Sequence, residues 1–536
     1  MANDLNPPPT LASAAGQSTN TTQHPFLWGV ATSGYQSEGG YNGNGQPQNN
    51  WSLSEARELV MRTGKAAEFW HRYAEDFQTC RQMGLNSFRL GLEWARIQPS
   101  LQPGIAPPPS FDAQALDAYA DRIAACRQAG LEPIVTLHHF THPAWLGTDA
   151  WLEEATIDQF VDYVRISVMH INRRLVSQYQ LPPIYWYITI NEPNILVLNT
   201  YLGRQFPSDV LPGPKTILRA YNHLLTAHVL AYNCIHDIYE AQGWVTPLVS
   251  LNTYCSDLYW SEKVIWDLLN HVQQGIKPTH LRDYIHSKAN QLEAALRNAK
   301  LPFRRDLPYQ LGRLVHFVSN SFGYRSFDLE QLDLFLTTLN TSPRSRVFDY
   351  VAIDYYDPFI AHTLRLPMFS DFEFASKGLR AWLMNGITSK WWDWRSLPEG
   401  LHFFCKYYAQ EYPNQSLLIA ENGMALRRKP DNSVASRRGD QLHRSEFLEA
   451  HIQQVQRLIH EGVPLVGYMH WSLTDNYEWG SYTPRFGLFT IDFEQSSDRL
   501  MIDHLGDRPS ETYARLIQNI QVEAEIRRSP SATDQR

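Results

Sequence analysis

A repeated unit of helix, glycine and strand is the feature that most restricts how this chain can fold. Residues 80–85 (Cys-Arg-Gln-Met-Gly-Leu) lead into a strand-like segment at 87–90, and residues 126–131 (Cys-Arg-Gln-Ala-Gly-Leu) lead into another at 133–137. Each is preceded by apolar residues at helical spacing. A helix that ends at glycine and returns the chain to a buried strand is the building unit of a parallel sheet.

Further segments along the chain repeat this alternation. Eight segments have the composition of strands, namely 26–33, 87–94, 132–140, 185–192, 246–254, 350–357, 417–421 and 463–473. Eight strands with helices between them predict an α/β fold, a single-domain (β/α)₈ TIM barrel with its active site at the C-terminal ends of the strands.

The predicted barrel does not use the whole chain. We expect it to cover 25–521, after a disordered arm at 1–24 that is rich in Pro, Ala, Ser, Thr and Asn, and before a polar tail at 522–536. The stretch 256–346 is too long for one crossover and contains several helical patterns. It predicts a helical excursion, either over the C-terminal face of the barrel or as a small subdomain.

Two of the predicted strands stop at a glutamate. The apolar run 417–420 ends at Glu421, and the run 185–190 ends at Asn191 and Glu192, where Pro193 prevents the strand from continuing. One such glutamate more often marks only the turn after a strand. Two at the same ends of parallel strands face one pocket, and retaining glycoside hydrolysis needs two carboxyl groups about 5–5.5 Å apart.

Composition narrows the classes of partner. Sixteen Trp, 27 Tyr and 24 Phe exceed what a core requires, and their rings suit sugar faces, although packing explains most of them. A net charge of −8 predicts neither nucleic acid nor an anionic membrane surface as partner. No apolar run approaches a membrane span, and the start of the chain does not resemble a signal peptide. Five scattered cysteines are typical of free thiols in a reducing compartment, so we expect a cytoplasmic protein.

Seven segments together resemble glycoside hydrolase family 1, the retaining β-glucosidases and β-galactosidases. They are 26–39, 88–94 (Phe-Arg-Leu-Gly-Leu-Glu-Trp), 136–140 (Thr-Leu-His-His-Phe), 189–193 (Thr-Ile-Asn-Glu-Pro), 420–423 (Ala-Glu-Asn-Gly), 470–479 (His-Trp-Ser-Leu-Thr-Asp-Asn-Tyr-Glu-Trp) and 485–488 (Arg-Phe-Gly-Leu). They follow the family order from Phe26 to Asp492. The resemblance implies a barrel enzyme without a cofactor that hydrolyses a β-glycoside.

The same resemblance implies roles for the catalytic residues. Glu421 is expected to attack the anomeric carbon, and Glu192 to protonate the leaving oxygen and then activate water. Arg89 is expected to keep Glu421 ionised, with Tyr356 donating to the same carboxylate. Asn191 is expected to bind the sugar 2-hydroxyl.

Sugar recognition in this family falls to another set of positions. Gln36, His139, Glu478 and Trp479 are expected to hydrogen-bond the sugar, Trp471 to form the floor beneath it, and Trp394 to lie on the aglycone side. The pair His138 and His139 suggests a metal, but adjacent residues of a strand point to opposite faces, so we expect none.

Related activities differ at visible positions. Enzymes for 6-phosphorylated sugars hold the phosphate with Ser and Lys where this chain has Glu478 and Trp479, so an unphosphorylated sugar is expected. Plant-type thioglucosidases lack the acid/base glutamate, and a non-catalytic carbohydrate-binding protein would lose one of the two glutamates; both are present here. A transglycosylase would keep both, so hydrolysis and transfer remain alternatives. Glucose, galactose or fucose preference, the aglycone and the oligomeric state also remain open.

One position departs from the family. Asp354 stands where the family usually has Asn before two tyrosines. Either Asp354 accepts a hydrogen bond as the amide would and changes little, or it adds a third carboxylate that raises the pKa of Glu192.

Overall fold

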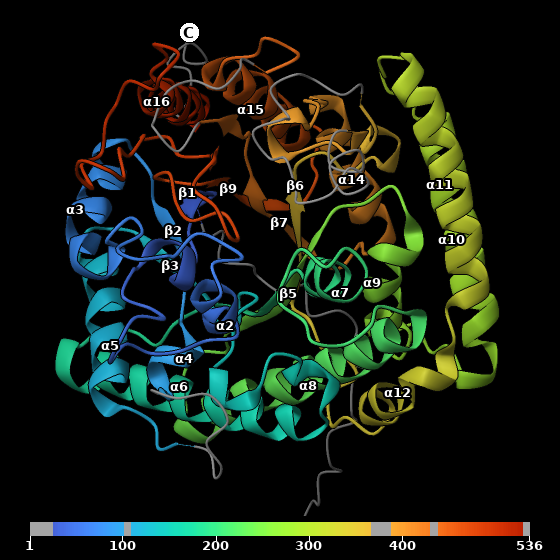
Figure 1. The fold of residues 1–536 in the computed structure, drawn as a ribbon, viewed down its shortest axis with the longest axis horizontal. Coiled ribbons are helices and arrows are strands. Elements are labelled where there is room, and N and C mark those ends of the chain that lie inside the picture. The colour runs from blue at the N-terminus through green and yellow to red at the C-terminus, as the bar shows by residue number, and fades with distance from the viewer. Residues whose placement is uncertain (1–24, 101–108, 366–386, 429–437, 529–536) are drawn as a thin grey trace, which may run out of the picture.

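Parallel strands form a closed barrel at the centre of the molecule, and helices surround it (Figure 1). The computed structural model describes residues 25–100, 109–365, 387–428 and 438–528. The barrel strands pair in the order β1-β2-β3-β4-β5-β6-β7-β9, with β9 closing onto β1. They are β1 (Leu27–Ala31), β2 (Ser87–Gly91), β3 (Glu132–Thr136), β4 (Trp186–Asn191), β5 (Leu248–Tyr254), β6 (Tyr350–Tyr355), β7 (Ser416–Asn422) and β9 (Leu465–Trp471).

All eight predicted strands are therefore confirmed, and so is the (β/α)₈ fold. Two further short strands, β8 (Leu426–Arg427) and β10 (Pro484–Arg485), were not predicted and form a separate antiparallel pair. The predicted helices that end at a glycine are also present. Gly84 and Gly130 follow these helices and adopt φ of +82° and +80°. Such values favour glycine, which has no Cβ to clash.

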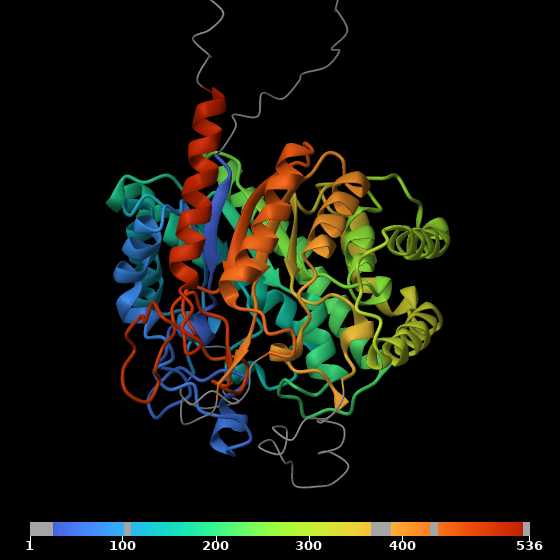
Figure 2. The same ribbon diagram turned by 90° about the horizontal axis from the view of Figure 1, so that it is seen from above.

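The helices that follow the strands around the barrel are long. They are α3 (Phe69–Gln82), α5 (Ala113–Gln128), α6 (Ala155–Tyr179), α8 (Pro214–Gln242), α14 (Pro398–Glu411), α15 (Arg444–His460) and α16 (Pro509–Arg528). The last of these lies beside β1, where the Tyr513 hydroxyl donates to the Gly29 carbonyl at 2.9 Å (Figure 2). Short helices near the strand ends are α1 (Gly34–Ser37), α2 (Ser52–Ala56), α4 (Trp94–Ile97) and α7 (Pro193–Tyr201).

Between β5 and β6 the chain forms four helices within the predicted excursion. They are α9 (Lys263–Asn270), α10 (Leu281–Asn298), α11 (Leu307–Ser326) and α12 (Asp333–Asn340). Both views place α10 and α11 at one outer edge of the molecule (Figures 1 and 2). At the C-terminus, α16 runs to Arg528 and so enters the stretch expected to be a polar tail. The expected arm at 1–24 lies outside the described residues.

Two apolar layers hold the barrel together. One lies between strands and helices, and the other fills the barrel interior with Ala31, Ile134, Ile188, Tyr350, Ala352, Leu418, Ala420 and Met469. A filled interior makes the barrel a rigid support for the side chains at the strand ends. All five cysteines are free thiols, and four of them are buried, with Cys234 partly exposed. None of the helices in the described ranges is long and apolar enough to cross a membrane.

Candidate active site

The two predicted glutamates meet at the C-terminal ends of β4 and β7. Glu192 follows β4 directly and has φ of +37°, a left-handed conformation that few non-glycine residues adopt. Glu421 follows an irregularity in the pairing of β6 with β7, which sets it opposite Asp354. One carboxylate oxygen from each of Glu192, Asp354 and Glu421 lies within 4.8 Å of the others. This separation is close to the one that a double-displacement glycosidase requires.

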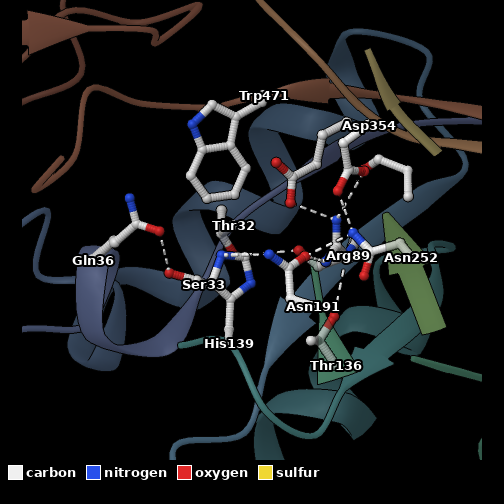
Figure 3. A network of polar contacts seen from close by, with 12 residues as sticks. Thr32, Ser33, Gln36, Arg89, Thr136, His139, Asn191, Asn252, Asp354 and Trp471 are labelled. Atoms are coloured by element: carbon white, nitrogen blue, oxygen red, sulfur yellow. Dashed lines mark hydrogen bonds and ion pairs between the residues drawn. The ribbon is translucent and has the colours of Figure 1, made fainter. Parts of the chain in front are cut away.

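Glu421 is held by donors on both of its oxygens. Arg89 Nη1 donates to Oε1 at 2.6 Å, and the Tyr356 hydroxyl donates to Oε2 at 2.7 Å. Arg89 is itself fixed by Thr136 Oγ1 at 3.0 Å and by the Asn191 side-chain oxygen, at the centre of the network in Figure 3. Burial raises the pKa of Glu421, and Arg89 and Tyr356 act against that increase. These contacts stabilise the ionised form.

Glu192 has the opposite surroundings. It is buried, and its Oε1 has no hydrogen-bond partner within the described structure. Burial raises the pKa of Glu192 well above its ordinary value, and the neighbouring carboxylates of Asp354 and Glu421 raise it further. Because both carboxyl groups share one pocket, the difference in donors favours the negative charge on Glu421 and the protonated form of Glu192.

Asp354 and Asn252 complete this cluster. Asn252 donates through Nδ2 to Asp354 Oδ2, and also to the Asn191 side-chain oxygen at 2.7 Å. Asp354 Oδ1 has no hydrogen-bond partner in the described structure and lies 4.0 Å from Arg89 Nη1. The sequence analysis missed Asn252. It follows the apolar residues of β5 toward the strand end, the same pattern that identified the two glutamates, and would have been found by applying that pattern to every strand.

A second polar group lies across the pocket, beneath Trp471. The Trp471 indole nitrogen donates to Glu478 Oε1 at 3.0 Å, and Gln36 Nε2 donates to Glu478 Oε2 at 3.1 Å. Ser33 in turn donates to the Gln36 side-chain oxygen at 2.7 Å, as Figure 3 shows. Burial raises the pKa of Glu478 to about 8, against the effect of the Trp471 hydrogen bond. The Glu478 carboxyl can therefore both donate and accept near neutral pH.

Stacked rings form the wall beside this group. His139 stacks on Trp471 with ring centroids 5.7 Å apart and on Trp479 at 5.9 Å. His139 Nε2 also lies 3.4 Å from the Asn191 amide nitrogen. Burial and the nearby Arg89 charge hold the pKa of His139 well below its ordinary value, so the ring is neutral. Trp479 packs against Phe206 as well, which fixes the orientation of the wall.

A cavity of about 710 Å³ connects these groups to the surface. Glu192, Glu421, Trp471, Glu478 and Trp479 line its inner end. Tyr254 stacks on Tyr356 beside these groups, and further apolar lining comes from Trp394, Trp260, Val318 and Phe322, of which Val318 and Phe322 are exposed at the outer end. Of the predicted site residues, Arg89, Gln36 and Asn191 contact the lining from behind, and Tyr356 and His139 belong to it.

Two groups of side chains raise the question of a metal. His138 accepts from the Trp151 indole nitrogen at 3.3 Å, whereas His139 faces the cavity, so the two rings point apart. Among the described residues, the carboxylates of Glu192, Asp354 and Glu421 are close enough to surround a cation. Arg89 already places a positive charge 2.6 Å from Glu421 and 4.0 Å from Asp354, so the cluster has a cation of its own.

The fold and the site together define a class of protein. A closed parallel barrel that brings together, at its C-terminal end, a carboxylate held by donors and a buried carboxyl with a raised pKa has the parts of a glycoside hydrolase. The model of glycosyl hydrolase family 1 matches residues 18–258 and 289–504, and the chain belongs to this family. It is a β-glycosidase of that family.

Curated relatives are similar along most of their length. A 6-phospho-beta-galactosidase of Clostridium acetobutylicum is 24% identical over 491 residues, covering 89% of this chain and 94% of the relative. The 6-phospho-beta-galactosidase 1 of Streptococcus pneumoniae is 26% identical over 500 residues, covering 88% and 93%.

Solved structures agree on the fold. A beta-glucosidase from Thermotoga maritima in complex with castanospermine aligns with a TM-score of 0.63 and 21% identity, covering 93% of this chain and 99% of that one. The same enzyme in complex with galacto-hydroximolactam aligns with a TM-score of 0.61. At such identities the likeness concerns the barrel alone.

Proposed function

We propose that this protein is a retaining β-glycosidase that hydrolyses unphosphorylated terminal β-D-glucosyl residues, with β-D-galactosyl and β-D-fucosyl residues as related substrates. The observation that carries the proposal is the asymmetry of the carboxylate pair. Glu421 receives hydrogen bonds from Arg89 and Tyr356, whereas Glu192 lies within 4.8 Å and has an oxygen without a donor.

The reaction follows from this asymmetry. Glu421 is ionised and attacks the anomeric carbon, while Glu192 gives its proton to the leaving glycosidic oxygen. Once the glycosyl-enzyme has formed, Glu192 takes a proton from the incoming water, and the bond to Glu421 breaks with net retention. Asn191, held by Arg89 and Asn252, is placed to bind the 2-hydroxyl as charge develops on the ring.

The preference for an unphosphorylated sugar is supported by the inner end of the cavity. A phosphate ester needs cationic partners there, and among the described residues that line the cavity none is Lys or Arg. Glu478, with Trp471 and Gln36 as donors, instead offers a carboxyl group to sugar hydroxyls. The relatives named 6-phospho-beta-galactosidases thus share the family with this chain, and we infer a different substrate.

A substrate panel tests this proposal. We expect hydrolysis of 4-nitrophenyl β-D-glucoside, galactoside or fucoside, with a product that is first released as the β-anomer by NMR. The 6-phosphates of the glucoside and the galactoside are expected to react at least a hundredfold more slowly in kcat/KM. A preference for either phosphorylated glycoside would overturn the assignment of Glu478, and an α-anomer as first product would overturn the retaining mechanism.

Transfer to an acceptor other than water is the second candidate. The outer part of the cavity is apolar, with Trp394 and Phe322 in its wall, and such a wall can hold an alcohol in place of water. Measuring released glucose against released nitrophenol with added octanol separates the two outcomes. Equal amounts indicate hydrolysis, and a deficit of glucose indicates transfer.

A further inference from the structure

An exposed apolar stripe runs along α11, at the outer edge of the molecule. Leu307, Leu311, Leu314, Val318 and Phe322 recur every three or four residues, which places them on one face of the helix. Each of these side chains is between 51% and 65% exposed. We call this set the α11 stripe. Its neighbour Phe317 is 67% exposed. Soluble proteins rarely leave so continuous an apolar surface open, so it indicates an interaction site.

The opposite face of α11 is firmly seated, so the stripe is not the result of a loosely attached helix. A Cβ on Gly312 would lie 2.1 Å from the Ala361 carbonyl oxygen, and a Cβ on Gly323 would lie 2.6 Å from the Trp260 ring. The glycines therefore allow α11 to approach its neighbours closely. Between them His316 is buried, with Nε2 3.6 Å from Asp257 Oδ2. The fold holds the helix so that its apolar stripe faces outward.

Arginines outnumber acidic residues along α11 and just before it, where Asp306 caps the helix and lies 3.8 Å from Arg304. The sequence of α11 contains Arg313 and Arg325 and no acidic residue, and Arg304 and Arg305 precede its start. All four arginines are exposed. This contrasts with the net charge of −8 for the whole chain. A local surface that joins an apolar stripe to several arginines complements an anionic lipid surface. It disfavours a second copy of the same surface, because the arginines of the two copies would repel each other.

The stripe is also continuous with the cavity of the active site. Val318 and Phe322 belong both to the stripe and to the lining of the cavity, and Ser319 and Gly323 of the same helix also line it. An aglycone that leaves the cavity on this side emerges beside the stripe. A lipid surface in contact with the stripe would therefore lie at the mouth of the cavity.

We propose that α11 docks this enzyme on an anionic lipid surface, with the α11 stripe in the lipid and the arginines against the headgroups. The expectation from net charge was that no anionic membrane surface is a partner; that expectation averaged over the whole chain, and this proposal departs from it for one local surface. This inference rests on the proposed β-glycosidase function. The substrate class that fits it is a β-glycoside with a long apolar aglycone, presented from the lipid surface.

Vesicle flotation of the full chain tests the docking. We expect the protein to float with vesicles of phosphatidylcholine and 30% phosphatidylglycerol, and less with phosphatidylcholine alone. The variant Leu311→Gln/Leu314→Gln/Phe317→Gln should reduce the partition coefficient at least tenfold, because it removes exposed apolar side chains from α11. It should leave the active site unchanged, because these three residues do not line the cavity. Leu59→Gln/Leu211→Gln/Val245→Gln, which changes exposed apolar residues elsewhere, is the matched control and should float as the wild type does. Arg305→Gln/Arg313→Gln/Arg325→Gln should weaken binding to the anionic vesicles only.

Kinetics separate this proposal from the proposed function. The Leu311/Leu314/Phe317 variant should hydrolyse 4-nitrophenyl β-glucoside at the wild-type rate, and lose at least fivefold in kcat/KM for dodecyl β-glucoside embedded in the anionic vesicles. If the wild type hydrolyses the aryl glucoside but binds neither kind of vesicle, the docking proposal is wrong and the proposed function stands. Another outcome is that light scattering shows the wild type to be a dimer and the variant a monomer, with no binding to vesicles. That result would mean that the stripe binds a second copy of the chain, and it would overturn the docking proposal. If the wild type does not hydrolyse the aryl glucoside, the proposed function is wrong, and the flotation result still decides the docking proposal.

Discussion

The inner and outer ends of the cavity are built from different kinds of side chain. At the inner end Gln36, Trp471 and Glu478 are buried and joined by hydrogen bonds of 3.0 and 3.1 Å. At the outer end Trp394 and Phe322 are apolar and partly or largely exposed. A buried polar group left without its partner costs about 1–3 kcal/mol, whereas apolar contact only scales with area, at about 25 cal/mol per Å². We therefore expect the sugar to be specified narrowly and the aglycone broadly.

The largest effect is expected where the inner end meets the reacting bond. Glu421→Ala removes the attacking carboxylate and should reduce kcat by roughly four to six orders of magnitude for every glycoside, whatever its aglycone. Azide or formate should restore turnover of an activated aryl glucoside and give the inverted product, which NMR of the glycosyl azide detects. A folded Glu421→Ala protein with full activity would remove the basis of the proposed mechanism.

The next prediction concerns Glu192, which we propose as the group that protonates the leaving oxygen. Glu192→Gln should reduce kcat/KM by about 10²–10⁴-fold for alkyl glucosides, which need protonation, and far less for 2,4-dinitrophenyl glucoside. The measurement is a plot of log kcat/KM against the pKa of the leaving group for both proteins. Parallel lines would contradict the acid/base role, and a steeper line for the variant supports it.

A pair of variants compares the two ends directly. Glu478→Gln should lower kcat/KM by about 5–150-fold on all glucosides, because a buried hydrogen-bonding group left without its partner costs about 1–3 kcal/mol. Trp394→Ala should lower it by about tenfold for a bulky apolar aglycone and hardly at all for methyl glucoside. The check is the full set of four rates, two variants on two substrates. If Trp394→Ala affects both substrates equally, the contrast between the ends is wrong.

The sequence indicated which residues lie together at the inner end of the cavity and gave little indication of the outer end, for a physical reason. Glu192 and Glu421 follow apolar strands, and a strand in a closed barrel directs its last residues into one pocket. Trp394 was predicted from the resemblance, but Val318 and Phe322 belong to α11, whose place depends on the packing of Gly312 and Gly323 against residues distant in the chain. Such contacts leave no local pattern, so the excursion at 256–346 could be predicted as helical without its position.

The sequence left two alternatives for the effect of Asp354, because it shows the substitution but not which residues surround it. The structure places it beside Glu192 and Glu421 and gives its Oδ2 a donor, Asn252. Its Oδ1 has no hydrogen-bond partner within the described structure, and Arg89 Nη1 is 4.0 Å away. Burial, and then the charge of Glu421, raise the pKa of Asp354 well above its ordinary value. The acceptor role and the third carboxylate are thus both present, and a pH profile decides which one affects catalysis.

The smallest effect is expected from Asp354→Asn, which removes a charge but keeps the size of the side chain. The alkaline limb of kcat/KM reports loss of the proton from the coupled carboxyl groups of Glu192 and Glu421. A neighbouring negative charge makes that proton harder to lose. Without Asp354 the apparent pKa should fall, so the alkaline limb should move to lower pH by about one unit. The acidic limb reports Glu421 and should stay nearly in place, because Arg89 and Tyr356 remain; this limb is the internal control. Profiles of both proteins on one aryl glucoside provide the test, and superimposable alkaline limbs would mean that Asp354 keeps its own proton and serves only as the acceptor for Asn252.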